Sequence, residues 1–120
     1  MGSKILIVED EFITVMDLEI ELKKRGFKVE MVSRGIDAIQ KVEEFKPDLV
    51  LMDITLPGEM NGIEAAKHIV TKFSIPLIFL TAHSDKTTLE QIESIQNKGL
   101  VTKPFESDFL LKSIEIALAK

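Results

Sequence analysis

Short apolar runs mark the strands that the sequence predicts. The runs KILIV (4–8), LVLM (49–52) and PLIFL (76–80) are nearly uninterrupted by polar residues. Continuous runs of this length are typical of strands buried on both faces, as in a parallel sheet. The stretch FKVEMV (27–32) alternates apolar and polar residues instead, which predicts a strand at the edge of the sheet. Residues 100–102 give a weaker fifth candidate.

Helical spacing fills the intervals between these runs. Apolar residues recur at steps of three and four, which predicts an amphipathic helix after each strand. The predicted helices span Phe12 to Leu22, Ile36 to Val42, Ile63 to Phe73, Leu89 to Ile95 and Leu110 to Leu118. Asn61 and Ser84 are expected N-caps, and Gly26 and Gly99 are expected to end helices.

This strict alternation of strand and helix predicts an α/β fold. Five strand–helix units imply an open parallel sheet with helices on both faces and right-handed crossovers. The 120 residues contain no repeat, linker or low-complexity tract. We therefore expect residues 1–120 to form one domain.

Chemically active side chains follow the strands. Glu9 and Asp10 come after the first strand, Asp53 after the third, Thr81 after the fourth and Lys103 after the fifth. Sites in open parallel sheets form at the carboxyl ends of the strands. Two unit charges about 4 Å apart repel by about 4 kcal/mol at an effective dielectric constant near 20. Three carboxylates at this edge therefore require positive charge.

A divalent cation and Lys103 would supply that charge. Mg²⁺ takes oxygen ligands, commonly one or two carboxylates, and keeps waters that a phosphate can replace. Asp53 could then attack phosphorus to form an aspartyl phosphate while Lys103 neutralises the transferred group. Taken singly, Asp53 and Thr81 are ordinary turn residues and Lys103 is an ordinary solvated cation. The coincidence of all these types at one edge favours phosphoryl transfer.

Composition narrows the setting. The formal net charge of −5 disfavours nucleic-acid binding through this domain, since phosphate contacts require clustered Lys and Arg. There is no cysteine, which excludes disulfides and thiolate metal sites. No apolar run approaches the roughly 20 residues of a membrane helix, and no signal peptide is apparent. We expect a cytoplasmic protein without membrane contact.

Four motifs together resemble one known family. The segments ILIVEDE, DLVLMDITLPGEMNG, PLIFLTA and GLVTKPF, taken in order, are similar to the receiver domain of two-component response regulators. The resemblance covers essentially the whole chain. It implies the flavodoxin-like (βα)5 fold with strand order 2-1-3-4-5.

The resemblance also implies a role for each site residue. Asp53 corresponds to the phosphoacceptor, and Glu9 and Asp10 to the acidic pair that holds Mg²⁺ together with Asp53 and the backbone carbonyl of Thr55. Thr81 and Lys103 correspond to the switch hydroxyl and the lysine that contact the phosphoryl group. The Lys103–Pro104 peptide bond is expected to be cis.

Signalling expectations follow from the same resemblance. The phosphoryl donor would be a histidine kinase or a phosphotransfer protein. Phosphorylation would remodel the face formed by the fourth helix, the fifth strand and the fifth helix, and a homodimer through that face is one expected output. Such a domain is not an enzyme beyond its own phosphorylation and dephosphorylation.

The sequence departs from the family pattern at two positions. Three residues, in place of the usual two, separate Pro57 from the pair Asn61–Gly62, so the loop there is one residue longer. Leu100 occupies the switch position that is usually Tyr or Phe. Thr55 and His83 stand two residues after the phosphoacceptor and the switch hydroxyl respectively, at positions that tune the lifetime of the acyl phosphate in the family.

Other functions remain open from the sequence alone. A haloacid-dehalogenase-like phosphatase needs a second acid two residues after the nucleophile, where this chain has Thr55, and usually a cap domain. A flavodoxin-like nucleotide binder needs a phosphate loop after the first strand, where this chain has acids. A pseudo-receiver would act only as an interaction module. The motifs name neither a cognate kinase nor an output pathway, and they fit a stand-alone receiver as well as one domain of a larger protein.

Overall fold

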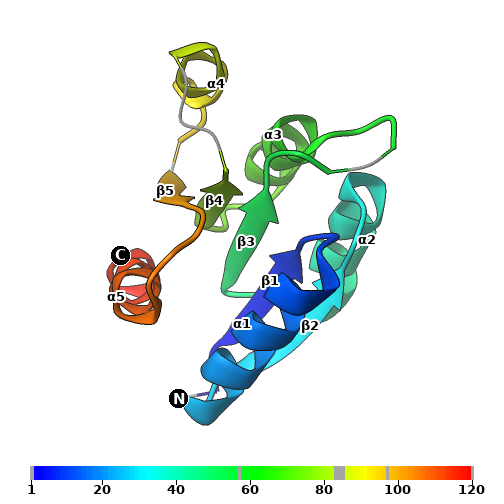
Figure 1. Cartoon of the computed structure of the whole chain (residues 1–120). Coiled ribbons are helices and arrows are strands. Elements are labelled where there is room, and N and C mark those ends of the chain that lie inside the picture. The colour runs from blue at the N-terminus through cyan, green and yellow to red at the C-terminus, as the bar shows by residue number, and fades with distance from the viewer. Residues whose placement is uncertain (1, 57, 83–85, 97, 120) are drawn as a thin grey trace.

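The computed structural model describes residues 2–56, 58–82, 86–96 and 98–119. Five strands and five helices alternate along the chain (Figure 1). Their bounds are β1 Lys4–Val8, α1 Phe12–Lys24, β2 Lys28–Val32, α2 Gly35–Phe45, β3 Leu49–Asp53, α3 Gly62–Lys72, β4 Leu77–Thr81, α4 Lys86–Ile92, β5 Lys98–Thr102 and α5 Ser107–Leu118. Within these described residues, no helix has the length and apolar character needed to span a membrane.

The strands form one parallel sheet in the order β2-β1-β3-β4-β5. This order confirms the expected flavodoxin-like topology. In the register, Val8 pairs with Met52 and Asp53 pairs with Leu80. The carboxyl ends of β1, β3 and β4 therefore lie level with one another at one end of the sheet.

Helices cover both faces of the sheet, as the alternation predicted. Helices α1 and α5 pack on one face through Leu18, Leu22 and Ile114. Helices α2 and α3 pack on the other through Val42 and Ile69, and two cores result. Each core is completed by alternate residues of the strands, because successive side chains of a strand point to opposite faces.

Burial along the strands separates the centre of the sheet from its edges. Every residue of β3 and β4 is buried, which agrees with their continuous apolar runs. No residue of β2 is fully buried, and this confirms the edge position predicted from its alternation. Strand β5 forms the second edge, with Val101 its one buried residue.

Three local predictions differ from the structure. Helix α4 ends at Ile92 instead of Ile95, although both side chains are buried. Gly99 was expected to end that helix but lies inside β5, which begins at Lys98. Phe12 belongs to the apolar spacing that predicted the first helix, yet it is 75% exposed at the first position of α1. Asn61 does cap α3, whereas Ser84 lies outside the described residues.

Candidate functional site

Three carboxylates meet where β1 and β3 end. Asp53 is the last residue of β3, and Glu9 and Asp10 follow β1 directly. Carboxylate oxygens of all three lie within 4.8 Å of one another. Glu9 and Asp53 are each 2% exposed, while Asp10 faces solvent. The sequence prediction that these acids converge is therefore correct.

Lys103 enters this cluster from the segment after β5. Its ammonium donates to Glu9 Oε1 at 2.5 Å and to Glu11 Oε1 at 3.3 Å, and its Nζ lies 3.6 Å from Asp53 Oδ2. The Lys103–Pro104 peptide bond is cis, which agrees with the expectation. The contact with Glu11 was not foreseen. Its only signal in the sequence was the third acid of the run Glu9–Glu11, which is equally well explained as a charge at a helix N-terminus.

The cluster holds more negative than positive charge, and the pKa values reflect this excess. Burial, together with its hydrogen bond to Asp53, raises the pKa of Glu9 above its ordinary value, although Lys103 pulls it down. Burial lowers the pKa of Lys103, but the hydrogen bond to Glu9 and the charge of Asp53 outweigh burial and raise it. Lys103 thus stays an ammonium, and the fold makes the ionised form of Glu9 less favourable than it is in water.

Both oxygens of the Asp53 carboxylate are oriented by neighbours. Oδ1 accepts the backbone N–H of Thr55 at 3.0 Å and the Thr55 hydroxyl at 3.2 Å. Oδ2 is the oxygen that faces Lys103. The two hydrogen bonds from Thr55 therefore fix the rotation of the Asp53 carboxylate, and Oδ2 points toward the Lys103 ammonium.

Thr81 ends β4 beside this cluster. It is 2% exposed, and its carbonyl oxygen accepts the backbone N–H of Lys103 at 2.7 Å. This hydrogen bond ties the end of β4 to the residue that contacts the carboxylates. The structure thus brings Thr81, Lys103 and Asp53 to one edge, as the strand ends predicted.

The longer loop between β3 and α3 leaves the site intact. Gly62, the first residue of α3, packs so closely that a Cβ there would overlap the carbonyl oxygen of Asp53 and lie 2.8 Å from its carbonyl carbon. Asn61 and Glu64 form a capping box that holds the start of α3 in place. Gly58, with φ of 94°, sits at the exposed end of the loop.

The donor set suits Mg²⁺. Hard oxygen ligands with room for waters are what this ion requires. Both oxygens of Glu9 already accept hydrogen bonds, Oε1 from Lys103 and Oε2 from the backbone N–H groups of Asp10 and Glu11 at 3.1 Å each. A contact of Glu9 with the ion through water fits this arrangement better than direct ligation, whereas Asp10 is open to solvent.

Among the residues that the structure describes, Leu100 is the predicted residue that lies away from the acid cluster. Leu100 lies in β5, half-buried against the core, and lines a groove with α4 residues Leu89 and Ile92. His83 and Pro57 lie outside the described residues. Leu100 therefore lies next to α4. The tuning role expected for His83 stays a prediction.

A doubly wound parallel sheet of this strand order, with an acid cluster and a lysine at the carboxyl ends of its strands, defines the flavodoxin-like class of folds. The sequence matches the family described as response regulator receiver domain over residues 5–115. The chain belongs to this family. Receiver domains are in general non-enzymatic signalling modules of two-component systems, and they bind Mg²⁺ at an acidic pocket.

Individual relatives agree with this assignment. The chain is 35% identical over 118 residues to the transcriptional regulatory protein PdtaR of Mycobacterium tuberculosis, covering 98% of this chain and 57% of PdtaR. It thus spans little more than half of that relative. The N-terminal domain of a response regulator/sensory box/GGDEF 3-domain protein from Carboxydothermus hydrogenoformans superposes with a TM-score of 0.89 at 37% identity, covering 98% of this chain and 94% of that one.

A solved structure also contains the metal. The receiver domain of sensor histidine kinase PA1611 from Pseudomonas aeruginosa has a magnesium ion coordinated in its active site cleft. It superposes with a TM-score of 0.90 at 28% identity, and the match covers 100% of both chains.

Proposed function

We propose that residues 1–120 act as one phosphoacceptor receiver domain in which Asp53 takes a phosphoryl group in a Mg²⁺-dependent reaction. The observation that carries this proposal is the cluster itself. Three carboxylates lie within 4.8 Å of one another, and Lys103 Nζ lies 3.6 Å from Asp53 Oδ2. Burying carboxylates without enough positive charge nearby is unfavourable. Such a cluster is therefore typical of a functional site that binds a cation.

Asp53 is the nucleophile in this proposal. One of its carboxylate oxygens forms the new P–O bond in line with the bond that breaks. With a phosphohistidine donor, the P–N bond breaks and the imidazole nitrogen keeps the electron pair and takes a proton. With acetyl phosphate, acetate leaves. The hydrogen bonds from Thr55 hold the carboxylate in one rotamer for this attack.

The cation site would consist of Glu9, Asp10, Asp53 and the backbone carbonyl of Thr55. When bound, Mg²⁺ supplies charge neutralisation on the carboxylates and on the oxygens of the transferring group. Lys103 supplies the remaining positive charge as a compact ammonium donor. The Thr81 hydroxyl would donate a hydrogen bond to a phosphoryl oxygen once that group is in place.

The output would arise on the α4–β5–α5 face. Thr81 ends β4, and Leu100 lines the groove beside α4, so a shift at the phosphoryl group reaches that face through one strand. We place the donor among histidine kinases or phosphotransfer proteins and the domain in the cytoplasm. Homodimerisation through this face is one form the output would take, and the net charge of −5 argues against nucleic-acid contact.

Mass spectrometry of the intact protein tests the proposal. We expect wild type treated with acetyl phosphate and Mg²⁺ to gain the mass of one phosphoryl group, and neither the Asp53→Asn variant nor wild type in EDTA to gain it. Asp48→Asn is the matched control, because Asp48 is exposed and lies just before β3, at the end of the sheet opposite the acid cluster. This variant should be phosphorylated like wild type. Equal phosphorylation of Asp53→Asn would refute the assignment.

The competing functions are less well supported. A phosphatase of the haloacid-dehalogenase type needs an acid at position 55, and the Thr55 there only donates hydrogen bonds to Asp53. A pseudo-receiver has no need of three clustered carboxylates and a lysine. Absence of turnover of a chromogenic phosphate ester, combined with phosphorylation by acetyl phosphate, would separate all three.

A further inference from the structure

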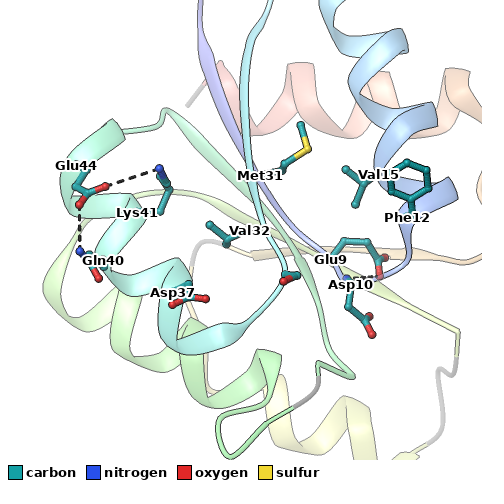
Figure 2. Close-up of a pocket in the computed structure, with 11 residues that line it drawn as sticks. Glu9, Asp10, Phe12, Val15, Met31, Val32, Asp37, Gln40, Lys41 and Glu44 are labelled. Carbon is teal, nitrogen blue, oxygen red and sulfur yellow. Dashed lines mark hydrogen bonds and ion pairs between the residues drawn. The ribbon is translucent and has the colours of Figure 1, made fainter.

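A groove lies between α1 and α2 at the carboxyl end of the edge strand β2. Its volume is about 560 Å³, within the range of small binding sites. Figure 2 shows the α2 side chains Asp37, Gln40, Lys41 and Glu44 along one side and those of Glu9, Asp10, Phe12 and Val15 along the other, with Met31 and Val32 of β2 between them. We call this the α1–α2 groove.

Apolar side chains in the groove are open to solvent. Phe12 is 75% exposed and Met31 is 36% exposed. Helix α1 also exposes Ile13, Met16 and Ile20, by 74%, 42% and 53%, although these side chains do not line the groove. Contiguous exposed apolar surface with a polar rim is typical of a surface that binds another molecule.

The rim of the groove is acidic. Asp10 and Asp37 lie on opposite sides of it, and Glu44 lies further along α2. Among the described residues that line the groove, Lys41 is the only basic one, and it already forms ion pairs with Glu30 at 3.5 Å and Glu44 at 3.7 Å. The groove therefore attracts cations and repels phosphate-bearing ligands.

We propose that the α1–α2 groove is a docking surface for a basic segment of a partner protein, one that carries an apolar side chain next to Lys or Arg residues. The apolar side chain would pack against Phe12 and Met31. The cationic groups would face Asp10 and Asp37. Charge selects this occupant over a second copy of the chain, since the chain is itself acidic with a net charge of −5.

Asp10 gives the groove a link to the cation site. It belongs both to the groove lining and to the carboxylate cluster. In this respect the inference rests on the proposed function. A divalent cation at the cluster would neutralise the negative charge of Asp10, which is also the charge that attracts the basic segment. Mg²⁺ should weaken docking, and docking should weaken Mg²⁺ binding by the same factor, because coupling between two sites is reciprocal.

Fluorescence anisotropy with a labelled probe peptide tests the docking. The probe is a short peptide that alternates Lys with Leu, and its acidic counterpart alternates Glu with Leu. We expect only the basic peptide to bind, with amide shifts in ¹⁵N spectra confined to the end of β2 and the facing sides of α1 and α2. Asp37→Asn and Phe12→Ala should each weaken it by about threefold or more.

Matched controls lie on α5. Asp108 occupies the first turn of α5 as Asp37 occupies that of α2, and Phe109 is 56% exposed. Asp108→Asn and Phe109→Ala should leave the affinity unchanged. Equal loss in these controls, binding of the acidic peptide, or amide shifts spread over other faces would overturn the proposal. Groove shifts that depend on protein concentration without peptide would identify a second copy as the occupant and would also overturn it.

The link to the cation is measured separately. The peptide affinity in Mg²⁺ should be lower than in NaCl of equal ionic strength, and Mg²⁺ binding is followed by titration without peptide. Unchanged peptide affinity in a protein that binds Mg²⁺ would refute the link. A protein that fails to bind Mg²⁺ contradicts the proposed function instead, and docking is then judged by the groove variants alone.

Discussion

The acid cluster and the α4 margin of the sheet are built in opposite ways. Glu9 and Asp53 are almost fully buried at the ends of central strands, and each is held by several hydrogen bonds. Helix α4 has seven residues, of which only Ile92 is buried, and it stands at the margin of the fold beside β4 and β5 (Figure 1). Leu89 of this helix is 40% exposed.

This contrast separates two requirements of a switch. Chemistry at phosphorus needs groups held in fixed positions, which central buried strands provide. A change of conformation needs an element whose opening free energy is low, and short, weakly buried helices have this property. Thr81 ends the fully buried strand β4 and so lies between the two regions.

Gly62→Ala should have the largest effect on stability and on phosphorylation. It therefore tests most strongly whether the acid cluster is more rigidly packed than the α4 margin. The new Cβ would overlap the Asp53 carbonyl, so either β3 or the start of α3 must move. We expect the free energy of unfolding to fall by about 3 kcal/mol, with a loss of phosphorylation. Chemical denaturation and acetyl phosphate labelling measure the two effects.

The matched control for Gly62 lies in β5, beside the weakly buried helix α4. At Gly99 of β5 a Cβ would meet only Ile78 Cγ1, at 3.4 Å. Gly99→Ala should change the free energy of unfolding by about 0.5 kcal/mol or less, the usual range for a substitution without a clash. Equal destabilisation by both variants would show that the two regions are equally intolerant and would break the comparison.

Lys103→Met should have the next largest effect. It removes the cation that contacts Glu9, Glu11 and Asp53 while keeping the length of the side chain. Because a buried carboxylate loses its partner, we expect about 2 kcal/mol of destabilisation in EDTA and a smaller loss in Mg²⁺. Magnesium affinity should be retained or increased.

Chemical denaturation in EDTA and in Mg²⁺ tests this variant. Lys23→Met, which loses only an exposed pair with Glu19, is its control and should stay near wild-type stability. A Lys103→Met protein as stable as wild type in EDTA would show that the cluster needs no internal cation.

The pH dependence of stability follows from Glu9. Its pKa is raised on folding, so its contribution to stability is fully present below its ordinary value of 4.5 and is lost as pH rises through the raised value. Wild type in EDTA should lose stability over that window relative to Glu9→Gln. Mg²⁺ should remove the difference because it stabilises the ionised carboxylate. A parallel pH profile for the two proteins would contradict the raised pKa.

Leu100→Tyr should have the smallest effect on chemistry. Leu100 lines the groove beside α4 and lies outside the acid cluster. We expect the phosphorylation rate to stay within a few-fold of wild type, about 1 kcal/mol of barrier or less, while association of the phosphorylated form changes. A large loss of rate with unchanged association would place Leu100 in the reactive site.

The sequence predicted the buried centre of the sheet better than the weakly buried α4 margin. Continuous apolar runs identified β1, β3 and β4, and strand ends identified Asp53 and Thr81, because burial on both faces leaves a strong pattern. Helix α4 was predicted to continue to Ile95, three residues past its observed end, since its few apolar residues also suit an irregular segment that packs through Ile95. The exposure of Phe12 was not predicted, because local periodicity does not say what packs against the first turn of a helix.

Within the site, residue types were predictable but their contacts were not. The hydrogen bonds from Thr55 to Asp53 depend on the exact path of the turn after β3. The contact of Glu11 with Lys103 joins residues 92 positions apart, and it depends on how α1 begins relative to β5. The close packing of Gly62 on Asp53 likewise could not be predicted from the sequence, because it depends on how α3 approaches the end of β3. The sequence did place the start of α3 at the pair Asn61–Gly62.

The most direct test of the central claim locates the phosphoryl group chemically. Borohydride converts an aspartyl phosphate to homoserine, and peptide mapping then identifies the modified position. Protein treated with acetyl phosphate in Mg²⁺ should carry this modification at Asp53 alone, and protein treated in EDTA should carry none. Modification at Asp10 or Glu9, or at Asp53 to the same extent in EDTA, would contradict the account.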